Sequence, residues 1–145
     1  MSEQTVRGLP RERVALHICR GNWTRDESAA LVGGYRPLVP FFADVPVGTL
    51  FLELATPRAG EIDVLGDLPR SLRIGVGVAN QKRAEPVDDV AARARRAVTV
   101  FGAERVLFTP DCGFATFADN PIATAAAAEA TLRTVVEAAA LARRG

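Results

Sequence analysis

Four short apolar runs divide the chain, and each one is followed by a Gly, Pro, Asn or Asp residue. They are rich in leucine and β-branched residues, and they occupy Arg13–Cys19, Thr49–Leu54, Leu72–Ala79 and Arg105–Thr109. Short runs of this kind, bounded by turn residues, predict strands. Because the apolar positions are almost continuous instead of alternating with polar ones, the pattern favours parallel strands that are covered on both faces.

The segments after the last two strands carry helical patterns. Pro86 begins a stretch with acidic residues in its first turn and regularly spaced apolar residues, and Gly102 ends it, which predicts a helix. An alanine-rich stretch predicts a second long helix from Ile122 to about Arg143. Weaker patterns predict two short helices at Asp26–Val32 and Arg36–Phe42, and a turn or two within Gly60–Leu65.

The spacing of the predicted strands limits the architecture. The strands begin 23 to 36 residues apart, whereas a (β/α)₈ barrel uses about 250 residues for eight units, or about 31 for each. Four such units fit, and a four-stranded open sheet of the doubly wound kind fits equally well. Since no repeat, linker or boundary interrupts the pattern, we expect a single α/β domain over residues 1–145.

Charge and composition exclude several classes of partner. The 18 basic and 17 acidic residues nearly balance, so we expect neither nucleic acid nor an anionic membrane surface as a partner. No run approaches the roughly 18 apolar residues of a membrane span. The first residues lack the pattern of a signal peptide, and two cysteines do not make a disulfide framework, so we expect a cytoplasmic location.

Polar and metal-capable side chains gather where the predicted strands end. They are His17 and Cys19 in the first strand, Glu53 in the second, Asn80 after the third, and Asp111 and Cys112 after the fourth. In parallel α/β proteins, binding sites form at this edge of the sheet. We therefore expect these side chains to belong to one site.

The spacing of His17 and Cys19 suggests a metal site. Residues i and i+2 of a strand point to the same side, and Cys112 from a neighbouring strand could join them. One imidazole and two sulfur atoms suit zinc, and Glu53 could be a fourth ligand that a substrate displaces. The competing interpretations are that the cysteines fill the core and that Glu53 forms a buried salt bridge with Arg58.

Other residues near this edge are candidates for substrate contacts. Asn22, Asn80 and Asp111 are the candidate substrate-binding residues, although asparagines in loops commonly cap turns instead. Gly75 and Gly77 lack the third glycine and the adjoining helix of a nucleotide-binding loop. Aromatic side chains could wall a pocket or simply pack in the core; they are Trp23, Tyr35 and Phe114.

Four segments, taken together, resemble a known family. ALHICRGNW, LELATPRAGEI, RIGVGVANQKRAEP and RVLFTPDCGFATFADNP are similar to the C-terminal barrel of cobalamin-independent methionine synthase. They are more similar still to its shorter bacterial and archaeal relatives, which include the epoxyalkane:coenzyme M transferases. The resemblance spans Gly8 to Ala142. It implies a Zn²⁺ ion that binds the thiol of the acceptor substrate and is held here by His17, Cys19, Cys112 and Glu53.

The chemistry that this resemblance implies is methyl or alkyl transfer to sulfur, as in methionine synthesis from homocysteine or in epoxide addition to coenzyme M. A cation at the thiol favours the nucleophilic thiolate. No residue is assigned as a catalytic acid or base.

The resemblance also implies that the four strands are the last four of a (β/α)₈ barrel. Half a barrel has two unpaired edges and an uncovered apolar inner face, which is an association site. We expect either a separately encoded N-terminal half-barrel or a second copy of this chain to complete it. The alternative is a truncated zinc-binding or structural module with impaired catalysis.

Overall fold

The computed structural model describes residues 6–22 and 24–144. Trp23, one of the aromatic residues expected near the site, lies outside the described residues, as do the first five residues and Gly145.

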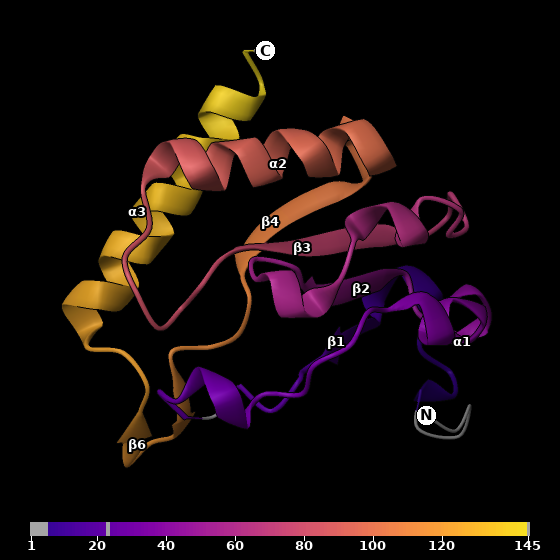
Figure 1. Cartoon of the computed structure of the whole chain (residues 1–145). Helices are drawn as coiled ribbons and strands as arrows, with labels where there is room; N and C mark the ends of the chain where they lie inside the picture. The colour runs from indigo at the N-terminus through magenta and orange to yellow at the C-terminus, as the bar shows by residue number, and fades with distance from the viewer. Residues whose placement is uncertain (1–5, 23, 145) are drawn as a thin grey trace.

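One parallel sheet organises the chain (Figure 1). All four of its strands pair in the order β1-β2-β3-β4, with β1 and β4 at the two edges. The strands are β1 (Ala15–Ile18), β2 (Thr49–Glu53), β3 (Arg73–Ala79) and β4 (Val106–Pro110). The prediction of four parallel strands is confirmed, and the predicted ends are within two residues of the observed ones.

Two long helices cover the β3 and β4 side of the sheet, and a short one, α1 (Val39–Asp44), precedes β2 (Figure 1). The helix predicted after Pro86 is confirmed as α2 (Val87–Phe101), and it ends where Gly102 adopts a φ of 89°. The second long helix is α3 (Ala125–Ala142). Among the described residues, no helix has the length and apolarity needed to cross a membrane.

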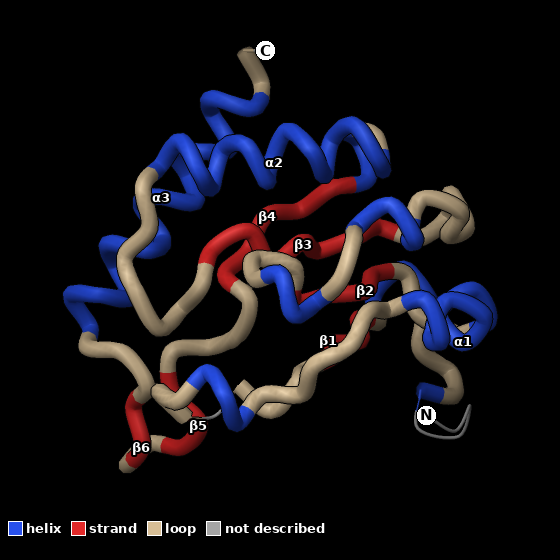
Figure 2. Tube along the Cα trace, viewed as in Figure 1, coloured by secondary structure: helices blue, strands red, loops and turns tan. Residues whose placement is uncertain are grey.

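The predicted start of α3 at Ile122 is too early. Thr124 caps the helix, and its hydroxyl accepts a hydrogen bond from the Ala127 N–H at 3.2 Å. Before it, β5 (Ala115–Phe117) and β6 (Asn120–Pro121) form an unpredicted antiparallel pair, which lies apart from the main sheet (Figure 2). The Ile122 N–H donates to the Phe114 carbonyl at 2.8 Å. This hydrogen bond holds residue 122 next to the β5–β6 pair, outside the helix.

The loop predictions are only partly correct. The expected helix over Asp26–Val32 is a three-residue 3₁₀ turn at Glu27–Ala29, in which the Asp26 carboxylate accepts from the Ser28 N–H at 2.8 Å. The expected helix at Arg36–Phe42 is a 3₁₀ turn, Arg36–Leu38, that runs into α1. Within Gly60–Leu65 the expected turn is the 3₁₀ helix Ile62–Leu65.

The two faces of the sheet are covered differently. Residues that point toward the helices, such as Leu50, Leu52 and Ile74, are completely buried. On the opposite face His17, Phe51, Gly75 and Leu107 are neighbours in register, and all but the glycine remain partly or largely exposed.

Gly75 makes room for its neighbour on this face. A Cβ atom there would lie 2.1 Å from the Phe51 ring. This close packing against Phe51 accounts for a glycine at position 75, so the residue does not indicate a nucleotide-binding loop.

Candidate metal centre

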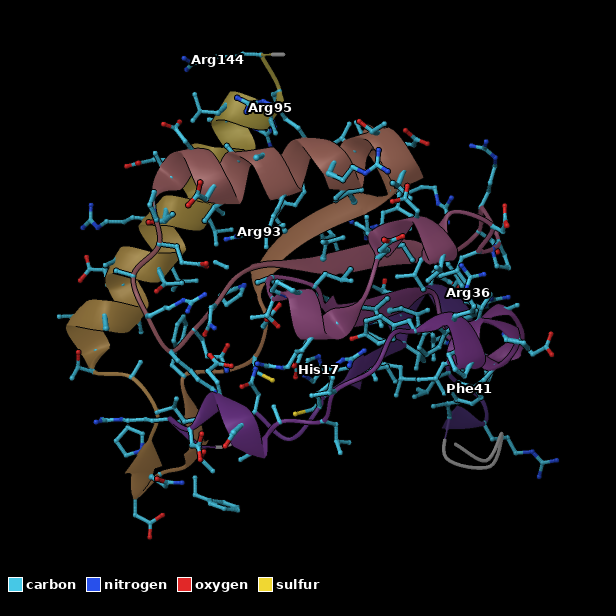
Figure 3. All side chains as sticks on the ribbon, in the orientation of Figure 1. His17, Arg36, Phe41, Arg93, Arg95 and Arg144 are labelled. Carbon is cyan, nitrogen blue, oxygen red and sulfur yellow. The ribbon has the colours of Figure 1, made fainter. Side chains whose placement is uncertain are left out.

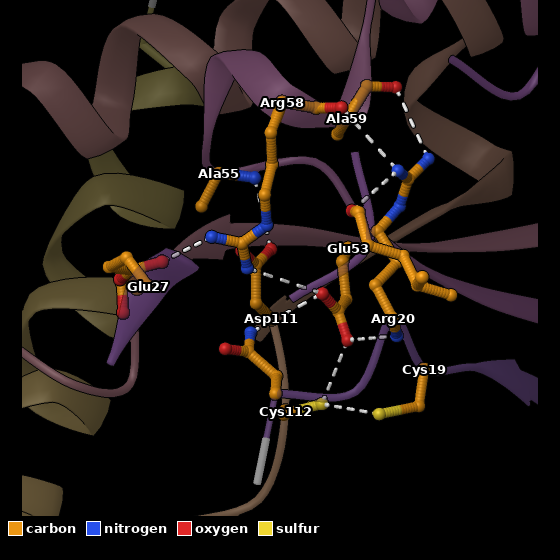
Figure 4. A network of polar contacts seen from close by, with 12 residues as sticks. Cys19, Arg20, Glu27, Glu53, Ala55, Arg58, Ala59, Asp111 and Cys112 are labelled. Atoms are coloured by element: carbon orange, nitrogen blue, oxygen red, sulfur yellow. Dashed lines mark hydrogen bonds and ion pairs between the residues drawn. The ribbon is translucent and has the colours of Figure 1, made fainter. Parts of the chain in front are cut away.

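The structure brings four side chains together at the carboxyl ends of three strands. They are His17 in β1, Cys19 just after it, Glu53 at the end of β2 and Cys112 just after β4, and one donor atom from each lies within 4.8 Å of the others. Figure 3 places His17 beside the two cysteine sulfur atoms, and Figure 4 shows Cys112 between Cys19 and Glu53. All four predicted ligands therefore converge.

Cys112 is the central member of this group. Its Sγ atom lies 3.6 Å from Cys19 Sγ, 3.4 Å from His17 Nε2 and 3.0 Å from Glu53 Oε1. Tetrahedral zinc, with Zn–S bonds of about 2.3 Å and Zn–N bonds of about 2.0–2.1 Å, would separate its ligand atoms by about 3.4–3.8 Å. The sulfur and nitrogen spacing therefore fits a zinc ion, and the shorter sulfur–oxygen distance is that of a hydrogen bond.

The hydrogen bond between Cys112 and Glu53 reflects a protonated thiol. Burial, followed by the hydrogen bond and charge of Glu53, raises the pKa of the Cys112 thiol far above its ordinary value. A bound cation reverses this preference because it stabilises the thiolate. The surroundings of Cys112 therefore favour its thiol in the absence of an ion, and a bound cation would favour its thiolate.

Glu53 is almost completely buried, with 1% of its surface exposed, and contacts on both of its oxygen atoms hold its carboxylate in place. The Arg20 backbone N–H donates to Oε1 at 2.9 Å, and the Asn22 amide donates to Oε2 at 3.3 Å. Arg58 Nη2 lies 3.7 Å from Oε2. The predicted salt bridge with Arg58 and the predicted approach to the cysteines are thus both present.

Asn22, a predicted substrate contact, is buried, and the hydrogen bond of its amide nitrogen goes to Glu53. Asn80, another predicted substrate contact, is engaged at both ends of its amide. Its oxygen accepts from the Lys82 N–H at 2.8 Å, which caps the turn after β3, and its nitrogen donates to Glu27 at 2.6 Å. Both asparagines therefore order the loops around the candidate metal centre.

Asp111, the third predicted substrate contact, ties the Cys112 loop to the end of β2. Its Oδ1 accepts hydrogen bonds from the N–H groups of Leu54 and Ala55, both at 2.9 Å. Burial raises the pKa of Asp111 to about 7. Gly77 permits the approach, because a Cβ atom there would lie 2.2 Å from Oδ1.

Replacing Asp111 with alanine should lower the free energy of unfolding by about 2–3 kcal/mol, because a buried N–H group and a partly buried one lose their acceptor. Asp111→Asn keeps an acceptor oxygen in the same place, so we expect it to lose about 1 kcal/mol or less. Urea denaturation with a chelator present separates this effect from metal binding. Equal losses in the two variants would contradict the assigned role.

Arg20 was not predicted as part of the site. Its guanidinium donates to the carbonyls of Gly33 and Ala59 and lies 4.3 Å from the Tyr35 ring centroid. The Tyr35 hydroxyl in turn donates to the Glu53 carbonyl at 3.1 Å. The only signal in the sequence is that an arginine directly follows an apolar strand.

A pocket of about 310 Å³ opens beside the donors on the less covered face of the sheet. Its lining includes His17, Phe51, Thr109, Cys112 and Phe114. Phe114 walls this pocket as expected, whereas Tyr35 is buried in the core.

Four parallel strands with a histidine, two cysteines and a glutamate at their carboxyl rim define an α/β protein with a candidate metal centre. The family model described as "Cobalamin-independent synthase, Catalytic domain" matches residues 12–141. The chain belongs to this family.

Two relatives from Bacillus subtilis (strain 168) are similar in sequence, and each is described as an uncharacterized protein. YxjH is 31% identical over 128 residues and YxjG is 33% identical over 128 residues. Each alignment covers 86% of this chain but 33% of the relative. The chain thus spans about a third of the length of these relatives.

Solved structures share the fold. A B12-independent methionine synthase from Shewanella sp. W3-18-1, in complex with selenomethionine, matches with a TM-score of 0.78 and 20% identity. A putative vitamin-B12 independent methionine synthase from Listeria monocytogenes matches with a TM-score of 0.62 and 21% identity. The matches cover 98% of this chain and 41% and 38% of those chains. The four strands are therefore part of a TIM-barrel fold.

Proposed function

We propose that this chain supplies the zinc-binding half of a (β/α)₈ enzyme that transfers a methyl or other alkyl group to the sulfur of a thiol, such as homocysteine or coenzyme M. The observation that carries the proposal is the convergence of His17, Cys19, Glu53 and Cys112 within 4.8 Å at the strand ends. Membership of the methionine synthase family supports methyl transfer as the reaction class.

In this proposal His17, Cys19 and Cys112 hold the ion, and Glu53 is the fourth, exchangeable ligand. A bound zinc ion would stabilise the thiolate form of the substrate, so no separate strong base is needed. The Arg20 N–H holds Glu53 Oε1, the oxygen that also contacts Cys112, while Asn22 and Arg58 hold Oε2. The pocket next to His17 and Cys112 gives the incoming thiol access.

The test measures metal content and thiol ligation. Purified, reduced protein is expected to hold about one zinc per chain. The cobalt-substituted protein should show a changed absorption spectrum when homocysteine or coenzyme M is added, because a site with an exchangeable ligand accepts a new sulfur. Absence of bound metal under zinc-replete, reducing conditions, or a spectrum that no thiol alters, would contradict the proposal.

We further propose that four more parallel strands, the N-terminal half of a barrel, cover the two open edges of the sheet. Each edge strand leaves backbone N–H and C=O groups without a sheet partner. Beside β4 runs a groove of about 560 Å³, lined by apolar residues that include Leu107, Val135 and Val136. Val136 is 69% exposed, as expected for a surface that another element covers.

Methyl transfer is therefore expected only when these strands are present. The chain can be co-expressed with the part of the Bacillus subtilis relative YxjH that it does not match, and turnover compared with that of each part alone. We expect activity in the mixture and none in either part. If this chain alone turns over as fast as the mixture and is a monomer in analytical ultracentrifugation, the requirement is contradicted. If it is active alone and sediments as a homodimer, a second copy takes the place of the missing strands.

A further inference from the structure

A largely buried arginine, Arg58, lies between two carboxylates next to the candidate metal centre. It belongs to the 3₁₀ turn Pro57–Ala59, which follows β2, and its side chain is 11% exposed. Its Nη1 forms an ion pair with Glu27, and its Nη2 lies 3.7 Å from Glu53 Oε2 (Figure 4). Arg58 therefore interacts with the centre through the charge of one prospective ligand.

The Nη1 end of the guanidinium is held in place. Glu27, its partner, accepts a hydrogen bond from the Asn80 amide at 2.6 Å and lies 3.8 Å from Lys82 Nζ. The Gly33 N–H donates to the Arg58 carbonyl at 3.1 Å, which fixes the backbone as well. The position of the guanidinium is thus set by contacts outside the metal centre.

The other edge of the guanidinium has unused donors. Arg58 Nε and Nη2 are buried, and neither donates a hydrogen bond among the described residues. These two nitrogen atoms lie on one edge of the planar group, an edge that can donate to both oxygens of one carboxylate. Because buried donors are normally satisfied, this edge is suited to receive a carboxylate during function.

Glu53 is the carboxylate within reach of this edge. Its Oε1 accepts from the Arg20 N–H at 2.9 Å, so Oε2 can turn about this anchor. A shift of about 1 Å would bring Oε2 from 3.7 Å to the roughly 2.8 Å of a charge-assisted hydrogen bond with Arg58 Nη2. Asp111, whose charge also interacts with that of Arg58, is already tied to the end of β2.

A buried carboxylate that leaves a cation requires another charged partner. Glu53 is 1% exposed, so little water reaches it to stabilise a free charge. The Asn22 amide, 3.3 Å from Oε2, is a neutral donor. Among the described residues, Arg58 is the only basic side chain that forms an ion pair with Glu53.

We propose that Arg58 is a positioning residue for ligand exchange, and that its open edge takes up the Glu53 carboxylate when a thiol replaces Glu53 on the ion. In this exchange a metal–oxygen bond breaks, a metal–sulfur bond forms, the thiol proton passes to solvent and Glu53 stays ionised. The inference rests on the proposed function and adds the partner that receives the departing ligand. Because Arg58 and the ion compete for one carboxylate, Arg58 should weaken metal binding and strengthen thiol binding.

The test measures both affinities in the full chain and in Arg58→Met, which keeps an apolar stem and removes the charge. The thiol probe is 2-mercaptoethanol, a neutral molecule with no acidic group for Arg58 to bind, and homocysteine is measured beside it. Dissociation constants come from the thiolate–cobalt absorption, and zinc affinity from competition with a chelator. We expect both thiols to bind about 10-fold more weakly, as for the loss of one charged hydrogen bond, and zinc to bind several-fold more tightly.

Glu53→Gln separates this role from a general effect of charge. The amide keeps the shape of the side chain but carries no charge for Arg58 to take up. When Glu53→Gln is already present, we therefore expect Arg58→Met to leave thiol affinity unchanged. Arg58→Lys keeps the charge without the two-donor edge, so it should regain part of the thiol affinity, and it replaces Arg58→Met if that variant does not fold.

Arg93→Met is the matched control. Arg93 donates to the Val78 carbonyl at 2.7 Å and lies 3.0 Å from Glu85, and it forms no ion pair with Glu53 among the described residues. Wild-type affinities for zinc and both thiols are expected.

Three results would refute the inference and leave the proposed function standing. They are weaker zinc binding in Arg58→Met, unchanged thiol affinity in that variant, and an equal loss of thiol affinity with and without Glu53→Gln. A loss confined to homocysteine also refutes it, because Arg58 would then bind the acidic group directly. If neither thiol alters the spectrum of the wild-type chain, the proposed function itself fails.

Discussion

Substitution of Cys112 by serine is expected to weaken zinc binding by more than about 100-fold, beyond the usual effect of losing an outer-shell partner. Cys112 is the donor that contacts the other three, at 3.6, 3.4 and 3.0 Å from Cys19, His17 and Glu53. A serine hydroxyl stays protonated and cannot replace a thiolate. Competition with a chromophoric chelator measures the change.

Thr109→Ser is the control for this experiment, because Thr109 lines the pocket beside Cys112 but is not one of the four residues of the candidate metal centre. It should retain wild-type zinc affinity. Circular dichroism of both variants checks that the sheet is intact. Wild-type affinity in Cys112→Ser would remove the basis of the metal centre.

The variant Arg20→Met is expected to lose about 3–5 kcal/mol of unfolding free energy, since several buried carbonyls lose a charged donor. Arg20 is almost completely buried and donates to the carbonyls of Gly33 and Ala59, which belong to two different loops. Its contact with the Tyr35 ring, at 4.3 Å, is lost as well. Urea denaturation of the metal-free protein measures the loss.

Arg25→Met provides the comparison. Arg25 is exposed and donates to one carbonyl, that of Ile122, at 3.1 Å. Its replacement should reduce the free energy of unfolding by less than about 1 kcal/mol. A similarly small effect in Arg20→Met would show that the two loops are held by other contacts.

The parallel strands and α2 could be predicted because their signals are local. The continuous apolar run of β3 and the boundaries of α2 at Pro86 and Gly102 follow from residue type alone. The start of α3 could not, because high helix propensity extends back to Ile122 while a tertiary contact, its N–H to the Phe114 carbonyl, holds that residue outside the helix.

The site shows the same division between local and non-local information. The spacing of His17 and Cys19 predicts two donors on one side of a strand, and strand order brings in Glu53 and Cys112. The contacts of Glu27 and Arg20 depend on how long loops fold over one another, which no short pattern encodes. Asp111 is recognisable in the sequence as a polar residue at a strand end, but its role in holding the end of β2 depends on hydrogen bonds to residues more than fifty positions away.

Every donor in the prospective metal sphere lies in a strand of one sheet of this chain or within two residues after one. Under the proposed function, sulfur activation is therefore inherited as a unit, whereas recognition of the carbon donor depends on the remaining strands. Evolution or engineering can then change the alkylating agent by exchanging the opposite half of the barrel, while the machinery that prepares the nucleophile stays untouched.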